Sequence, residues 1–136
     1  MAENSCYTYF KIVGDFDPDV VTAMLGLQPE KYWRVGDLRQ NGTKYDFALW
    51  EYGRCADYDV FVENQMYTTI EPLLRKADVL NRIRNEYDVA FYLEIVPTIY
   101  VGNQNPCLAP SLKVIDFCHI TRTEIDIDMC VMDSEE

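Results

Sequence analysis

Apolar and polar residues alternate in three segments of the chain, a pattern typical of strands that bury one face. β-Branched and aromatic side chains, which fit a pleated and half-buried surface, dominate the same segments. The pattern predicts strands over residues 6–13, 44–52 and 124–132. In the last of these, the positions expected to point inward are Ile125, Ile127, Met129 and Val131, and those expected to point outward are Asp126, Asp128 and Cys130.

The longest strand candidate spans residues 88–101 and contains Pro97. Proline cannot donate a ladder hydrogen bond, so this strand either bends at Pro97 or lies at a sheet edge. A short aromatic segment, residues 30–35, precedes the predicted strand at 44–52. These two segments are expected to form a wide hairpin whose polar tip spans residues 38–43.

Apolar residues recur at helical spacing over residues 18–25, where the ends of the helix are also well marked. Asp17 is the expected N-cap, because its carboxylate can accept from the free N–H groups of the first turn. Pro18 occupies the first helical position, where its missing N–H costs nothing. Gly26 is expected to end the helix in a left-handed cap, and Pro29 prevents the helix from continuing.

Two further segments have helical spacing but lack such clear end signals. Residues 62–87 show helical spacing that Pro72 interrupts. Either Thr69 caps a helix that has Pro72 in its first turn, or a longer helix kinks at the proline. Residues 111–122 fit both a helix and a strand, but the strand would bury Asp116, so a helix is predicted.

In chain order these elements predict an α+β fold, with one largely antiparallel sheet and helices on one of its faces. The first six elements match the β-α-β-β-α-β pattern of a ferredoxin-like core, which a C-terminal helix and strand then extend. A length of 136 residues is enough for one hydrophobic core, so residues 1–136 are predicted to form a single domain.

The chain carries a net charge of −11, from 12 basic and 23 acidic residues. Such a surface repels nucleic acid and anionic membranes and attracts a basic protein partner. Solubility alone is the other explanation of the charge. The five cysteines are odd in number and contain no Cys-x-x-Cys pair, which favours reduced thiols and a cytoplasmic setting. Neither a signal peptide nor a membrane-spanning apolar run is expected.

The sequence lacks the motifs that mark common catalytic sites. Its single histidine, His119, excludes a two-His metal site within one chain, and no phosphate loop, dinucleotide fingerprint or nucleophile elbow occurs. We therefore expect no metal and no cofactor. One carboxylate pair, Asp126 and Asp128, has a spacing that suits acid–base chemistry or a hard cation, and that equally fits the solvent face of a strand.

The other candidate site is an aromatic, basic and acidic turn at residues 33–37. Arg34 and Asp37 either pair with each other and fix the turn, or Arg34 binds an anionic ligand with Trp33 as a stacking wall. Trp50, in the next predicted strand, belongs to the same candidate site.

Four segments together carry a family resemblance: Gly-Asp-Phe-Asp-Pro at residues 14–18, Trp-Arg-Val-Gly-Asp at 33–37, Trp50, and Ile-Asp-Ile-Asp at 125–128. In these segments the chain resembles the small bacterial proteins catalogued as domain of unknown function 4279. The resemblance implies a bacterial, cytosolic, single-domain protein. Because the family has no established activity, the resemblance transfers no catalytic residue.

Small size, strong acidity, ten tyrosines and the missing catalytic motifs predict a protein-interaction module more than an enzyme. An immunity protein that neutralises a basic toxin is one such module. The alternative is a small-anion-binding or enzymatic domain whose site includes Trp33, Arg34, Asp37 and Trp50.

Overall fold

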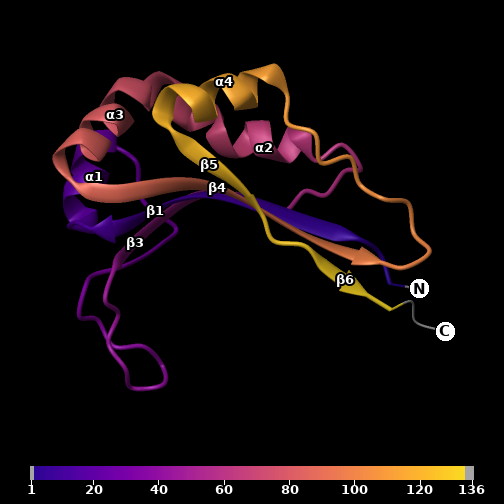
Figure 1. Cartoon of the computed structure of the whole chain (residues 1–136), viewed down its shortest axis with the longest axis horizontal. Coiled ribbons are helices and arrows are strands. Elements are labelled where there is room, and N and C mark those ends of the chain that lie inside the picture. Colours follow the sequence, from indigo (N-terminus) through magenta and orange to yellow (C-terminus); the bar gives the residue numbers. More distant parts are fainter. Residues whose placement is uncertain (1, 134–136) are drawn as a thin grey trace.

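The computed structural model describes residues 2–133, which form two layers: a six-stranded sheet and a set of helices packed against one of its faces (Figure 1). The predicted α+β class and the largely antiparallel sheet are confirmed. In chain order the elements are β1 (Ser5–Asp15), α1 (Pro18–Leu25), β2 (Lys31–Trp33), β3 (Ala48–Cys55), α2 (Glu63–Ile70), the 3-10 helix η1 (Glu71–Lys76), α3 (Ala77–Glu86), β4 (Asp88–Tyr100), α4 (Leu112–Thr121), β5 (Thr123–Ile127) and β6 (Cys130–Met132).

The long strands β1 and β4 form the centre of the sheet, whose order is β2-β3-β1-β4-β5. They pair antiparallel over eleven residues, from Ser5 opposite Thr98 to Asp15 opposite Asp88. β3 lies antiparallel on the other side of β1, and β2 lies antiparallel beside β3. β5 and then β6 run parallel to β4 along its outer edge, so the sheet is mixed.

Helix α1 has the ends that its sequence predicts. The Asp17 side chain accepts a hydrogen bond from the Asp19 N–H at 2.9 Å, and Pro18 opens the helix. Gly26 has φ 68°, a left-handed conformation that costs glycine little, and its N–H donates to the Thr22 carbonyl oxygen. Local capping therefore fixes both ends of this helix.

The helical pattern at residues 62–87 is one helical segment with a 3-10 piece, η1, between α2 and α3. Pro72 is the second residue of η1, so the longer helical segment continues through the proline with 3-10 geometry. Thr69 is not a cap: it lies inside α2, and its hydroxyl donates to the Gly53 carbonyl oxygen of β3 at 2.6 Å. A Cβ at Gly53 would lie 2.7 Å from the Thr69 carbonyl oxygen, so glycine permits this close approach of helix and strand.

Residues 111–122 contain a helix, as predicted. The Ser111 hydroxyl oxygen caps α4 by accepting from the Val114 N–H at 3.4 Å. The helix ends at Arg122, which has φ 56°. Arg122 is the only non-glycine residue with a positive φ in the part of the chain that the structure describes.

The predicted strand at 124–132 is instead two strands, β5 and β6. They are separated opposite Pro97, which lies inside β4 and cannot donate to a partner strand. The side chains predicted to point inward are between 37% and 60% exposed: Ile125, Ile127, Met129 and Val131. The prediction of burial is wrong because these residues lie at the sheet edge, which the helix layer does not extend over.

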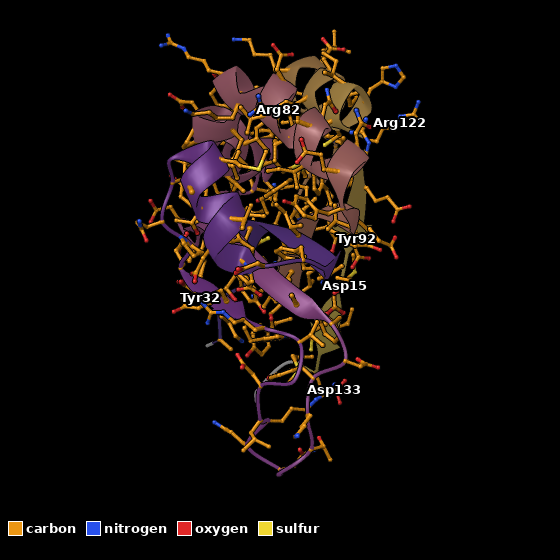
Figure 2. All side chains as sticks on the ribbon, turned by 90° about the vertical axis from the view of Figure 1, so that its left-hand side faces the viewer. Asp15, Tyr32, Arg82, Tyr92, Arg122 and Asp133 are labelled. Carbon is orange, nitrogen blue, oxygen red and sulfur yellow. The ribbon has the colours of Figure 1, made fainter. Side chains whose placement is uncertain are left out.

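The strand predicted at 44–52 begins later and runs further, as β3. Its partner β2 has only three residues, so residues 44–47 have no strand to pair with beyond one bridge, Leu38 to Lys44. Figure 2 shows the resulting hairpin, which projects away from the body at the end opposite Arg82 and Arg122.

The hydrophobic core fills the space between the helices and the sheet. Phe10 of β1 contacts Phe91 of β4 and Phe117 of α4, with ring centroids 5.7 and 6.3 Å apart, which joins the two layers. Trp50 of β3 is fully buried, and its Nε1 donates to the Thr22 hydroxyl of α1 at 3.0 Å. The polar atom of the largest core side chain is therefore satisfied inside the protein.

Candidate functional site

One face of the sheet has no helix packed on it, and we call it the open face. Side chains along a strand alternate between the two faces of the sheet. In β1 the side chains that point into the core are those of Cys6, Thr8, Phe10 and Ile12. Tyr7, Tyr9 and Lys11 therefore point to the open face. Because paired residues of neighbouring strands share a face, the register adds members from the other strands: Lys31, Trp33, Glu51, Tyr92, Glu94 and Asp126.

A row of charged side chains crosses the open face from β2 to β5. In spatial order its members are Lys31, Glu51, Lys11, Glu94 and Asp126. Lys11 lies directly opposite Glu51, and its Nζ is also 3.2 Å from Oε2 of Glu94 on the other neighbouring strand. The signs alternate until the end of the row, where Glu94 and Asp126 are side by side. The row therefore has a negative pole at β4 and β5.

Glu94 is an unusual carboxyl group, because it is only 3% exposed on a face without helices. Burial is the main cause that raises the pKa of Glu94, to about 7, and hydrogen bonding to Asp126 raises it further. The positive charge of Lys11 acts in the opposite direction. Burial also raises the pKa of Glu51. Glu94 therefore holds a proton at pH values below about 7.

Aromatic rings surround this charge row. Tyr7 and Tyr9 stack with their ring centroids 6.0 Å apart, and the guanidinium of Arg54 lies 3.9 Å from the centroid of Tyr7. The Lys11 ammonium lies 5.3 Å from the centroid of Tyr92. Burial, and then the nearby acidic side chains, raise the pKa of Tyr9 to about 12, so this tyrosine remains a neutral hydroxyl. Cation–π contacts hold these rings in place.

A second aromatic group continues the open face into the hairpin. Trp33 stacks on Tyr45 with centroids 3.9 Å apart and meets Phe47 edge-on at 5.6 Å. The Trp33 Nε1 donates to the Phe47 carbonyl oxygen at 2.9 Å. Trp33, predicted as a stacking wall for a ligand, therefore stacks within its own hairpin.

Arg34 ties the turn at residues 33–37 to the start of α1. Its guanidinium pairs with Asp19 and lies 4.0 Å from Asp17, while its backbone N–H donates to the Asp37 carboxylate at 2.8 Å. Arg34 and Asp37 thus interact through the backbone and not through the predicted side-chain pair. Since Arg34 already has two carboxylate neighbours, this geometry favours a structural role for the turn. Trp50, the fourth predicted residue of that site, lies in the core on the other face of the sheet.

The family comparison covers both the turn and the open face. Residues 4–132 match the family described as a domain of unknown function (DUF4279). The chain belongs to this family. The predicted resemblance is therefore confirmed over nearly the whole chain. No curated protein and no solved structure matches the chain.

In this DUF4279 protein the two predicted carboxylates, Asp126 and Asp128, do not form a pair on one strand. Asp126 lies on the open face beside Glu94, whereas Asp128 follows the end of β5 and donates its N–H to the Ile95 carbonyl oxygen at 2.9 Å. Sequence reasoning missed Glu94 and Lys11. A usable signal existed for Glu94, because it is the one charged residue after Asp88, the first residue of β4, in a strand of mostly apolar and aromatic residues.

A metal site, a reactive thiol and a membrane-spanning helix each have requirements that can be compared with the described residues of the DUF4279 chain. Within residues 2–133 no group of three or more His, Cys, Asp or Glu side chains is placed to hold a metal ion. Burial raises the pKa of the Cys6 and Cys118 thiols to about 11, so neither is an activated nucleophile. No helix in the same range is long and apolar enough to span a bilayer.

Proposed function

We propose that this protein is an interaction module that binds a positively charged segment of a partner protein on its open face. The observation that carries the proposal is the set of tyrosines around a carboxylate pair on the one sheet face without a helix. Tyr7, Tyr9 and Tyr92 supply rigid contact area with polar ends, which suits the core of an interface. Glu94 and Asp126 supply the negative charge that selects a cationic partner.

The carboxylate pair gives the proposed binding a defined proton chemistry. Asp126 is exposed at the end of the charge row, so it is the first acid that a lysine or arginine of the partner meets. A cation beside Glu94 favours the charged form of this carboxyl, whose pKa in the free protein is about 7. Binding near neutral pH therefore releases a proton from Glu94, and affinity increases as the pH rises toward neutrality.

The charge of the whole chain supports the same proposal. A net charge of −11 speeds the encounter with a cationic protein and disfavours nucleic acid. Within this class of function, we favour an immunity protein against a basic toxin, such as a nuclease.

The test is a calorimetric titration of the purified protein with the product of a neighbouring toxin-like gene. We expect Asp126→Lys to weaken binding by about 10- to 100-fold, because the new charge repels the cations of the partner. The matched control is Asp116→Lys, the same charge change on the exposed surface of α4, which should bind within about twofold of wild type. An equal loss in both variants would contradict binding at the open face, and no binding by wild type would reject the pairing itself.

We infer, as a finer statement of the fold, that β1 to β4 form a ferredoxin-like core. The order β2-β3-β1-β4 supports this, because β1 and β2 run parallel with β3 between them, as in a split β-α-β unit. The inference bears on function, since this arrangement covers only one face of the sheet with helices. A solved structure with another strand order would reject it.

A further inference from the structure

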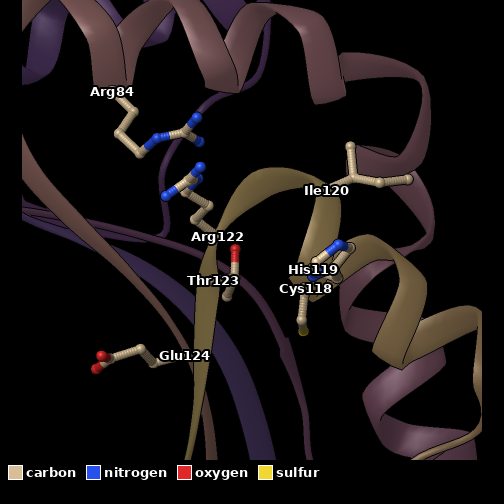
Figure 3. Close-up of a pocket in the computed structure, with 7 residues that line it drawn as sticks. All are labelled: Arg84, Cys118, His119, Ile120, Arg122, Thr123 and Glu124. Atoms are coloured by element: carbon tan, nitrogen blue, oxygen red, sulfur yellow. The ribbon is translucent and has the colours of Figure 1, made fainter.

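A pocket of about 890 Å³ lies at the end of the helix layer, away from the open face of β1 and β3, where α4 turns into β5. Figure 3 shows its lining, which includes Arg84 of α3 and Arg122 at the end of α4. The two guanidinium groups point toward each other across this pocket (Figure 3). We propose that the pocket binds the phosphate group of a small phosphomonoester between these two arginines.

Arg84 is held in place by its own hydrogen bonds. Its Nη1 donates to the Thr121 carbonyl oxygen at 2.8 Å and to the Asn81 side-chain oxygen at 2.5 Å. These bonds satisfy the end of α4 and fix the plane of the guanidinium. A guanidinium has five donors, so Arg84 keeps further N–H groups that can point at a ligand.

The Arg122 side chain, unlike that of Arg84, forms no hydrogen bond with the other described residues. Arg122 occupies the left-handed position at the end of α4, where glycine is the usual residue and another residue costs roughly 1 kcal/mol or more. Among residues 2–133, neither Arg122 nor Arg84 forms an ion pair with a carboxylate. Glu124, the one acid in the lining, points away from both guanidinium groups (Figure 3). Two like charges therefore converge in a protein that is otherwise strongly acidic.

An anion between the two guanidinium groups would offset the repulsion between their positive charges. It could also accept paired hydrogen bonds from the N–H groups of each guanidinium. Phosphate suits this geometry best, because guanidinium groups bind its oxygens bidentately with charge-assisted hydrogen bonds. The pocket is much larger than a phosphate ion, and Ile120 and Cys118 add apolar lining for an organic group. The net charge of −11 repels anions at long range, so binding must come from this local arrangement.

The experiment is a titration of the intact protein with phenyl phosphate and with inorganic phosphate at pH 8, followed by backbone NMR shifts. At this pH both probes are largely dianionic. We expect shifts at residues 118–124 and 84, with tighter binding of phenyl phosphate than of inorganic phosphate. Equal affinities would reject the organic subsite, and the absence of saturable shifts with both probes would reject the pocket altogether.

The decisive variant is Arg122→Gly, because glycine suits φ 56° and the fold is therefore retained. We expect its affinity for phenyl phosphate to fall by about 10- to 100-fold, while its melting temperature without ligand stays equal or rises. Arg82→Ala is the matched control, since it removes one positive charge from α3 outside the pocket lining and should leave the affinity unchanged. An Arg122→Gly variant that binds as wild type does would overturn the proposal, whatever the outcome of the partner titration.

Discussion

Among single residues, Glu94 is the least expected on the sheet. A buried carboxyl group costs free energy unless it is paired or protonated, and here both conditions are partly met. Lys11 approaches one oxygen at 3.2 Å, while burial and Asp126 bring the pKa to about 7. The charge of Glu94 therefore responds to small changes around it near neutral pH. The proposed binding of cations at the open face would make use of this response.

We predict that Glu94→Gln removes part of the pH dependence of stability. The pKa of Glu94 is raised from 4.5 to about 7 on folding, so between these values the folded chain holds a proton that the unfolded chain has lost. The contribution of Glu94 to the free energy of unfolding is therefore greatest below pH 4.5 and is lost as the pH rises through 7, a change of roughly 3 kcal/mol. Urea unfolding at pH 5 and pH 8 measures this difference.

The control for this prediction is Glu71→Gln on η1, an exposed glutamate away from the open face. The free energy of unfolding of this control should depend on pH in the same way as that of wild type. If Glu94→Gln also runs parallel to wild type between pH 5 and pH 8, the pKa of Glu94 is not raised and the account of the charge row is incorrect.

At the scale of elements, sequence predicted what is decided locally. The start and end of α1 depend on Asp17, Pro18 and Gly26, which lie within a few residues of each other, and all three act as expected. The Thr69 cap and the continuous strand at 124–132 were wrong, because both depend on which distant segment lies alongside. The local propensity of a segment contains no information about which distant segment packs beside it.

Two isoleucines near the edge of the sheet point to the same side but differ in burial, and this difference gives a prediction. Ile95 and Ile127 are register partners on the same side of the sheet, but Ile95 is fully buried and Ile127 is 44% exposed. We expect Ile95→Ala to reduce the free energy of unfolding by about 2–5 kcal/mol and Ile127→Ala by less than about 1.5 kcal/mol. Urea unfolding of both variants checks this, and equal losses would show that β5 is covered.

The candidate site itself could not be predicted from sequence in the same way. Lys11, Glu94 and Asp126 come from three strands far apart along the chain, and only the register of β1, β4 and β5 brings them together. Trp33 and Arg34 were found because they form a local motif, yet their contacts lie mostly within the hairpin and the start of α1. The sequence therefore identifies local motifs more readily than it identifies residues that distant strands bring onto one face of the sheet.

At the scale of the whole molecule, the two layers present different chemistry. The open face combines tyrosines with a negative pole at β4 and β5, whereas the end of the helix layer holds Arg84 and Arg122 around a pocket. The helix layer covers one face of the sheet and leaves the other face without helices. The two proposals together predict a protein that binds a cationic partner at the open face and a small anion at the end of the helix layer.

The most direct test of the account is hydroxyl-radical footprinting of the protein alone and in complex with the cationic partner identified by titration. We predict that Tyr7, Tyr9 and Tyr92 become protected in the complex, while Tyr32, which is 49% exposed and lies on the opposite side of the sheet, reacts as before. Protection of Tyr32 with unchanged reactivity of the three open-face tyrosines would contradict the central claim.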